Sequence, residues 1–309
     1  MSTDAAMAFQ IVTPFIIVAG MAGNIIVCSL IIKNKKMRSS FNFLLLNLAA
    51  SDLLCSILGA LFYASEIRNH YFSDGKANRG EIEGIACKVV TTSIGLTTNS
   101  SVFTLAAIST DRFFAIVHPW KHKLATIKRK TRIVIAGIWL LVLVTSLPLA
   151  LVMIKQPNKV PNSHFVGNCI AHLVNENSYK AAAFVDLIAC YIIPMAIILR
   201  TSFAIIKHLW CESSCRGFAP DQLETNRALL KSRKRITRIV LSVIMAFNIF
   251  WLPWAILEGS FLIGAIHHID EKTFVVVFTL VLSSASVNPI LYSLQSPQFR
   301  RAVKKMFGF

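Results

Sequence analysis

Seven stretches of about 20 mostly apolar residues follow one another along this chain, each long enough to cross the hydrocarbon core of a membrane. They cover residues 9–32, 42–65, 86–117, 133–154, 181–207, 236–263 and 272–294. Backbone polar groups in hydrocarbon must be satisfied within the protein, so segments of this length predict α-helices. The mean hydropathy of +0.60 and the charged fraction of 15% agree with a membrane protein. We therefore predict an all-α membrane protein, in which residues 1–309 form one domain, a seven-transmembrane helix bundle.

The positive charge of the chain is divided unevenly between the segments that connect these helices. The net charge is +17, which would by itself suit a nucleic-acid partner. However, the odd-numbered connections and the tail hold 21 Lys and Arg residues, against seven on the other side. Cytoplasmic segments of membrane proteins carry such an excess. We therefore expect no nucleic-acid partner, and a multi-pass protein of the plasma membrane with an extracellular amino terminus and a cytosolic carboxyl terminus.

The end of the chain has the pattern of a different kind of helix. Apolar side chains recur there at helical spacing, with basic side chains between them. The apolar ones are Phe299, Val303, Met306 and Phe307, and the basic ones are Arg300, Arg301, Lys304 and Lys305. The pattern predicts a short amphipathic helix at about residues 296–307, lying on the inner leaflet with membrane lipids as its partners.

The cysteines are sorted by the same topology. Of the seven, five fall inside predicted helices or on the cytosolic side, where disulfides are rare. Only Cys87, at the outer start of the third helix, and Cys169, in an outer loop, face the oxidising side. We therefore predict a disulfide between Cys87 and Cys169 that holds this loop over the bundle.

Polar residues interrupt two of the apolar stretches. Asp52 lies about midway along the second, where an unpaired charge would cost several kcal/mol, so we expect the carboxylate to be neutralised or to hold a cation. Ser101 and Asn288 are its candidate partners. In the last stretch, Pro289 removes a helical hydrogen bond beside Asn288 and close to Tyr292, which suggests a hinge.

Short sequence motifs occur in all seven stretches and make the pattern specific. They are GNIIV at residues 23–27, NLAASDL at 47–53, DRF at 111–113, Trp139, Pro194, FNIFWLP at 247–253 and NPILY at 288–292. In these motifs, and in their order and spacing, the chain resembles the rhodopsin-like (class A) G-protein-coupled receptors along nearly its whole length. The resemblance implies a receptor rather than an enzyme, with an extracellular ligand and a heterotrimeric G protein as partners.

The resemblance also implies roles for the polar residues within the helices. Asp52, Ser101 and Asn288 correspond to a site that binds sodium in the family and collapses on activation. A protonated Asp52 within a hydrogen-bond network is the alternative. No other cofactor is expected.

The resemblance assigns coupling and switching to a second group of residues. Arg112, paired with its neighbour Asp111, is expected to contact the G protein once it is released. Pro253 is expected to kink the sixth helix, so that small rotations near Trp251 become larger movements at its cytosolic end. Other residues with implied switching roles are Val102, Pro194, Phe247, Pro289 and Tyr292.

Two positions depart from the family pattern. Arg233 stands where many relatives have a glutamate that pairs with the helix-three arginine, so this inactive-state ion pair is missing. Ser202 replaces a tyrosine that usually supports the active state. The two changes act in opposite directions.

The ligand class is narrowed by what the chain lacks and by two acids. Leu282 occupies the position of the retinal-binding lysine of opsins, and Ile94 that of the aspartate of amine receptors. Asp186 and Glu258 are carboxylates in the outer half of the bundle, which favours a cationic ligand, either a basic peptide or an amine bound unconventionally. The alternative is that either acid merely pairs with a loop Lys or Arg. If both acids are structural, a lipid or neutral ligand becomes the better interpretation. The candidate ligand-binding residues are Thr98, Asp186, Cys190, Trp251, Trp254, Glu258, Phe274 and Phe278.

Two other classes of function remain open from the sequence. A seven-helix transporter or channel would be expected to show inverted repeats or several intramembrane charges, and we find no repeat. A receptor-fold protein that binds its ligand without coupling to a G protein is the other alternative.

Overall fold

The computed structural model describes residues 3–34, 39–72, 81–119, 128–155, 177–215, 223–266, 271–295 and 297–308. The regular elements within these ranges are all helical. They are α1 (Thr3–Lys33), α2 (Ser40–Phe72), α3 (Glu81–Val117), α5 (Lys128–Lys155), α7 (Asn177–Asp186), η3 (Leu187–Ile192), α8 (Ile193–Cys215), α9 (Leu223–Leu262), α10 (Glu271–Gln295) and α11 (Pro297–Phe307).

The described residues contain seven helical segments that are long and apolar enough to cross a membrane. They are Ile11–Lys33, Ser40–Ser65, Lys88–Val117, Lys130–Val152, Asn177–Leu209, Val240–Leu262 and Thr273–Leu291. Each agrees with a predicted stretch to within a few residues. The predicted seven-helix membrane fold is therefore confirmed.

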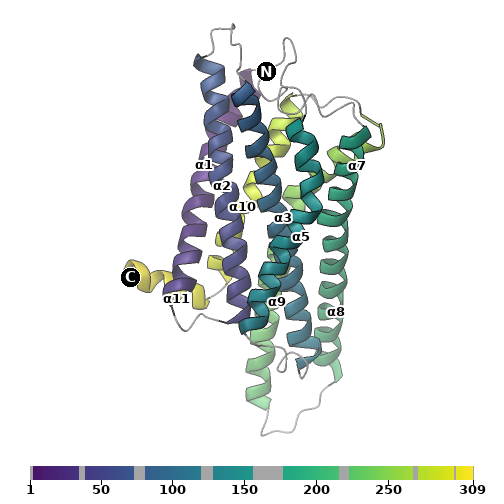
Figure 1. The fold of residues 1–309 in the computed structure, drawn as a ribbon. Coiled ribbons are helices and arrows are strands. Elements are labelled where there is room, and N and C mark those ends of the chain that lie inside the picture. The colour runs from purple at the N-terminus through teal and green to yellow at the C-terminus, as the bar shows by residue number, and fades with distance from the viewer. Residues whose placement is uncertain are drawn as a thin grey trace.

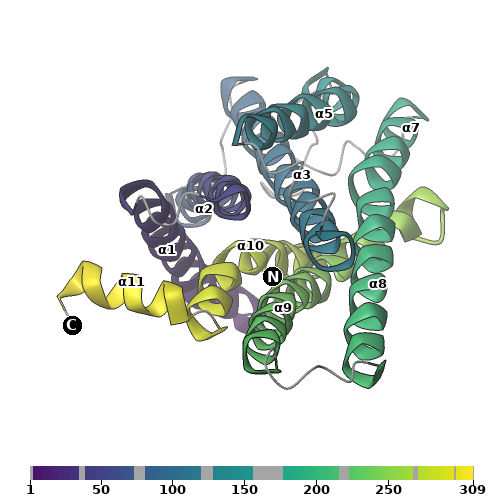
Figure 2. The ribbon, with the colours of Figure 1, turned by 90° about the horizontal axis from the view of Figure 1, so that it is seen from below.

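The seven spans run roughly side by side and form an elongated bundle (Figure 1). Seen from below in Figure 2, α3 passes between its neighbours at a slant, and it contacts α2, α5, α8 and α9. α10 also lies inside the bundle, where it packs against α1, α2 and α9. The central position of α3 suits its composition, because many of its Thr, Ser and Asn side chains are buried among the other helices. Those that are buried include Thr97, Thr98, Asn99, Ser100, Ser101 and Thr104.

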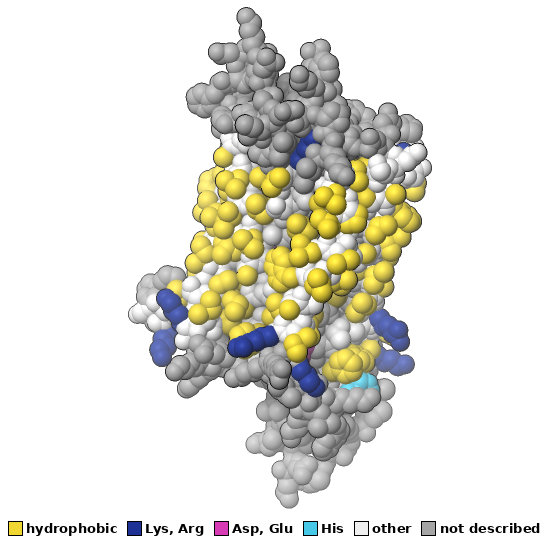
Figure 3. Space-filling model, in the orientation of Figure 1, with side chains coloured by type: hydrophobic (Ala, Val, Ile, Leu, Met, Phe, Trp, Pro, Cys, Tyr) yellow, Lys and Arg dark blue, Asp and Glu magenta, His cyan; other side chains and the backbone are white. Residues whose placement is uncertain are grey.

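The outside of the bundle is suited to lipid. Apolar side chains cover the middle of the face shown in Figure 3, and the described Lys and Arg side chains gather mainly at its lower end. Large apolar residues such as Phe15, Phe203 and Leu140 are exposed there or elsewhere on the surface. In a membrane these side chains contact lipid hydrocarbon, whereas in a soluble protein they would contact water.

The predicted amphipathic helix is also confirmed, as α11 (Pro297–Phe307). Its Phe299 is buried against the bundle, whereas the four basic side chains, Arg300, Arg301, Lys304 and Lys305, are exposed. Gly308 ends the helix with a φ of 79°, a left-handed conformation that glycine adopts at low cost.

The proline of the last span lies in close contact with α1. A Cβ atom at Gly23 would lie 2.8 Å from the Cβ of Pro289, which is closer than side chains approach. Only glycine therefore allows α1 to pack this tightly against the proline of α10.

One span differs from the sequence prediction. The prediction was a single helix over residues 181–207, but α7 and α8 are separated by the π-helical turn η3. A π-turn is wider than an α-turn and is often found at functional sites. Here η3 begins directly after Asp186 and contains Cys190.

Candidate functional site

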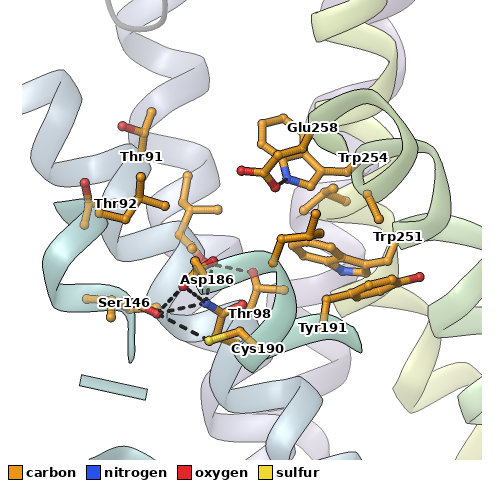
Figure 4. Close-up of a pocket in the computed structure, with 18 of the residues that line it drawn as sticks. Thr91, Thr92, Thr98, Ser146, Asp186, Cys190, Tyr191, Trp251, Trp254 and Glu258 are labelled. Carbon is orange, nitrogen blue, oxygen red and sulfur yellow. Dashed lines mark hydrogen bonds between the residues drawn. The ribbon is translucent and has the colours of Figure 1, made fainter. Parts of the chain in front are cut away.

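A cavity opens among the helices in the half of the bundle away from α11, between α3, α5, η3, α9 and α10 (Figure 4). The structure places all eight of the predicted ligand-binding residues in its lining. They are Thr98, Asp186, Cys190, Trp251, Trp254, Glu258, Phe274 and Phe278. Ile94 lines the same cavity, and Leu282 packs with it in one apolar cluster.

Aromatic rings form the α9 and α10 sides of the cavity. Phe274 stacks on Phe278 with 5.5 Å between ring centroids and meets Trp254 edge to face at 6.1 Å. Trp251 stacks on Phe247 below it, with centroids 5.7 Å apart and ring planes 10° from parallel. These faces offer large apolar area, and the electron-rich ring faces attract cations.

Asp186 is held by polar side chains from two other helices. Ser146 of α5 donates a hydrogen bond of 2.9 Å to Oδ1, and the Asn99 amide of α3 donates to Oδ1 and Oδ2 at 3.2 and 3.4 Å. The Asn99 amide also donates to the Ser146 hydroxyl at 2.9 Å. Asp186 therefore joins α3, α5 and α7 as well as lining the cavity. Sequence reasoning missed both partners.

Glu258 has a simpler environment. Its Oε2 accepts a hydrogen bond of 3.1 Å from Nε1 of Trp254, one turn earlier on α9. Within the described part of the chain, its other oxygen has no hydrogen-bond donor and neither acid is paired with a Lys or Arg. Of the two carboxylates, Glu258 is the one with an acceptor left for a ligand (Figure 4).

Two lysines lie close to the cavity wall. Lys88 on α3 is only 2% exposed and precedes the lining residues Thr91 and Thr92 by one turn. Lys180 on α7 places its ammonium 5.7 Å from the ring centroid of Phe261, another lining residue. The burial of Lys88 was not predicted, because charge alone suggests a solvent-facing residue at the start of a span.

The three predicted sodium-site residues come together in the centre of the bundle. Asp52 is 3% exposed; its Oδ1 accepts a 2.7 Å hydrogen bond from Ser101, and its Oδ2 accepts a 2.8 Å bond from the Asn288 amide. Trp251 donates a hydrogen bond of 3.2 Å from its indole to Ser284, one turn before Asn288 on α10. The floor of the cavity and the Asp52 cluster are therefore connected through one turn of α10.

Arg112 lies at the far end of α3 and is paired as predicted. Its Nε donates to Oδ2 of Asp111 at 3.1 Å, and a terminal nitrogen makes a second, closer contact to the same oxygen. The guanidinium also lies 4.3 Å from the ring centroid of Phe41 on α2. Sequence reasoning missed this ring, which gives the guanidinium a second contact within the bundle.

The structure describes most of the predicted switch residues. Val102, Pro194 and Phe247 are all buried, and Phe247 and Val102 belong to the main apolar core. Pro253 lies inside α9, and Pro289 lies inside α10. Ser202 is buried, and its hydroxyl has no hydrogen-bond partner in the described part of the chain. The side chains of Tyr292 and Arg233 lie outside the described residues.

The predicted disulfide also falls outside the described residues, because they exclude the side chain of Cys87 and all of Cys169. We expect peptide mapping of surface-expressed protein without reduction to recover Cys87 and Cys169 in one linked pair. A Cys87→Ser variant should release Cys169 as a free thiol. Recovery of both cysteines as free thiols from the unmodified protein would contradict the prediction.

Comparisons with known proteins agree on the family. The sequence model described as "7 transmembrane receptor (rhodopsin family)" matches residues 23–292. The chain is 30% identical to the Allatostatin-A receptor of Bombyx mori over 94% of this chain and 77% of that protein. It is 27% identical to Neuropeptide FF receptor 1 of Homo sapiens, over 99% of this chain and 71% of that protein. The crystal structure of squid rhodopsin has the same fold, with a TM-score of 0.75 and 22% identity over 97% of this chain and 85% of that chain.

The family match agrees with the helix order, the buried polar clusters and the motifs. It also confirms the expectation of a receptor rather than an enzyme, and it disfavours a transporter or channel. The chain belongs to the rhodopsin-like (class A) family of G-protein-coupled receptors.

Proposed function

We propose that this receptor binds an extracellular peptide through a cationic group and activates a heterotrimeric G protein. The observation that carries the ligand class is Glu258, a carboxylate in an aromatic cavity with one oxygen free of protein donors in the described part of the chain. A Lys or Arg side chain of a peptide would complete its hydrogen bonds, with the rings of Trp254 and Phe274 beside it.

A peptide is favoured over a small amine. Ile94, which lines the cavity, stands where amine receptors in this family carry their aspartate. One of the relatives is named as a receptor for a neuropeptide. The unconventional anchor suggested for an amine is Asp186, and Asp186 already accepts hydrogen bonds from Ser146 and Asn99.

The proposed signal passes down the bundle through Trp251. A ligand that shifts Trp251 disturbs its stacking on Phe247 and its bond to Ser284, which lies one turn before the Asp52 partner Asn288. Pro253 interrupts the hydrogen bonding of α9 close to Trp251 and provides the hinge. Movement of α9 is then expected to open the end of the bundle where Arg112 lies.

The same proposal fixes the orientation. The excess of Lys and Arg lies at the α11 end, so we place this end in the cytosol and the cavity on the outside of the plasma membrane. Arg112 is then on the side where a G protein is available.

A peptide panel tests the proposed ligand class. Cells that express the receptor are exposed to peptides containing Arg or Lys and to analogues with citrulline or norleucine in their place, with reporters for several G-protein pathways. We expect only cationic peptides to activate at low concentration, with the matched neutral analogues at least about tenfold weaker, the factor that follows from loss of a charge-assisted hydrogen bond. Activation by a neutral lipid, or equal potency of the neutral analogues, would contradict a cationic ligand.

Sodium binding at Asp52 is a separate part of the proposal. Asp52→Asn keeps the volume but removes the charge, so we expect agonist affinity to become independent of sodium concentration, whereas it should fall with sodium in the unmodified receptor. Potassium at the same ionic strength is the control. A sodium response that persists in Asp52→Asn would favour the hydrogen-bond network as the role of this cluster.

A further inference from the structure

A second hollow lies on the outer surface of the bundle, between α8 and α9 toward the α11 end. The two helices lie beside each other at one edge of the bundle (Figure 2). From α8 the lining includes Ile206 and Leu209. From α9 it includes Lys234, Arg238, Leu241, Met245 and Ile249.

The lining residues of α9 are ordered by chemistry along one face. Their spacing of four, three, four and four residues keeps them on one side of the helix. Lys234 and Arg238 are exposed at the end of the groove near the membrane surface, and Met245 and Ile249 are 61% and 64% exposed further in. The described lining of the groove includes no acid that would neutralise the two cations.

The row of lining residues on α9 is about as long as one leaflet of the hydrocarbon core is thick. Eleven residues separate Arg238 from Ile249, which is about 16 Å along a helix. Half of a hydrocarbon core is about 15 Å. A molecule with an anionic end at Arg238 would therefore have its apolar part beside Met245 and Ile249 within the same leaflet.

Thr237, a further lining residue from α9, adds a polar group to the groove. Thr237 is buried, and its hydroxyl has no hydrogen-bond partner in the described part of the chain. An unpaired buried hydroxyl is unfavourable, and an acceptor that entered the groove beside Arg238 would pair with it.

We propose that this groove is a binding site for one anionic phospholipid of the leaflet on the α11 side. The phosphate lies between Lys234 and Arg238, and an acyl chain follows Leu241, Met245 and Ile249. A sterol satisfies the apolar part of the groove but leaves both cations without a partner. In a zwitterionic phospholipid the phosphate is offset by its own ammonium group, so the attraction to the two cations is weaker than for an anionic lipid. The site is separate from the ligand cavity, with which it shares no lining residue.

The test uses the purified full-length receptor, with bound lipid counted by native mass spectrometry. The probes are phosphatidylserine and phosphatidylcholine with identical acyl chains. We expect phosphatidylserine to bind more tightly, and Lys234→Gln with Arg238→Gln to weaken it at least about tenfold; a contribution of about 1 kcal/mol for each basic residue would give about thirtyfold. The paired control, Lys130→Gln with Arg132→Gln, removes the same charge from exposed positions of α5 outside the groove and should leave this affinity within about twofold.

Two further variants test the other parts of the site. Met245→Trp fills the groove and keeps both cations, so it should also weaken phosphatidylserine. Thr237→Val removes the hydroxyl at nearly constant volume and should cause a smaller loss. Thermal unfolding of each variant checks that the receptor remains folded.

Several results would overturn the proposal. Equal affinity for the two phospholipids would exclude recognition of the anionic headgroup. An unchanged phosphatidylserine affinity in the Lys234 and Arg238 double variant would place the lipid elsewhere. Displacement of phosphatidylserine by soluble phosphoserine at similar concentration would indicate a site for the headgroup alone. Displacement by cholesterol, with no effect of the double variant, would indicate a sterol site.

Discussion

Replacement of Arg112 by alanine is expected to abolish agonist-dependent nucleotide exchange, or to lower it by about thirtyfold or more. Its guanidinium is held at the end of α3 by Asp111 and the ring of Phe41, and it is 13% exposed. Loss of one partner from a buried charge contact costs about 2 to 5 kcal/mol, and here the lost contact would be the one with the G protein. The measurement is nucleotide exchange on purified G protein at matched receptor levels.

Two variants separate this role from folding. Arg200→Ala removes an exposed arginine from α8 and should leave exchange unchanged. Asp111→Asn removes the charge that pairs with Arg112, so we expect higher exchange without agonist, since the guanidinium is released. Normal exchange by Arg112→Ala, with the receptor folded at the surface, would favour a receptor-fold protein that binds without coupling.

Neutralisation of Glu258 is expected to weaken binding of the cationic agonist by about tenfold to a hundredfold. A charge-assisted hydrogen bond contributes roughly 1.5 to 3 kcal/mol, which converts to this range. The change is Glu258→Gln, which keeps the size of the side chain and an oxygen that can accept from Trp254. Radioligand or fluorescence binding measures the effect, and the loss should be much smaller for an uncharged analogue of the agonist.

The second acid provides an internal comparison. We expect Asp186→Asn to weaken binding as well, but part of its effect should appear as lower thermal stability, because Asp186 accepts hydrogen bonds from α3 and α5. Glu258→Asp keeps the charge and should retain more affinity than Glu258→Gln. If both neutral variants bind the agonist as well as the unmodified receptor does, the acids are structural and a lipid or neutral ligand becomes the better interpretation.

The fold was predictable because the membrane imposes strong local rules. Span length and apolar composition locate the seven helices, and basic and apolar residues in alternation locate α11. The lining of the cavity was predictable for a related reason, since residues such as Trp254 and Glu258 lie one turn apart on one helix face.

What the sequence could not predict depends on distances between helices. The π-turn η3 lies within a continuous apolar stretch, and the apolar pattern of that stretch does not indicate a wider turn. Asn99 and Ser146 approach Asp186 from separate helices, so no local pattern connects them. The Asn, Ser and Thr content of α3 indicated buried polar contacts but did not identify their partners. The groove between α8 and α9 was not predicted for the same reason, because its lining comes from two helices whose relative position the sequence does not give.

The central claim is that a ligand in the cavity moves α9 and so exposes Arg112, and a distance measurement tests it most directly. Spin labels are attached at Lys130 on α5 and Arg235 on α9, both exposed, in a receptor whose Cys211 and Cys215 are replaced by serine. Pulsed electron paramagnetic resonance then measures their separation with and without the cationic peptide and the G protein, and nucleotide exchange is recorded on the same samples. We expect the peptide to lengthen this distance, the neutral analogue to leave it unchanged, and Glu258→Gln to shift the change to higher peptide concentration. A distance that stays constant while exchange proceeds would contradict movement of α9 as the means of activation.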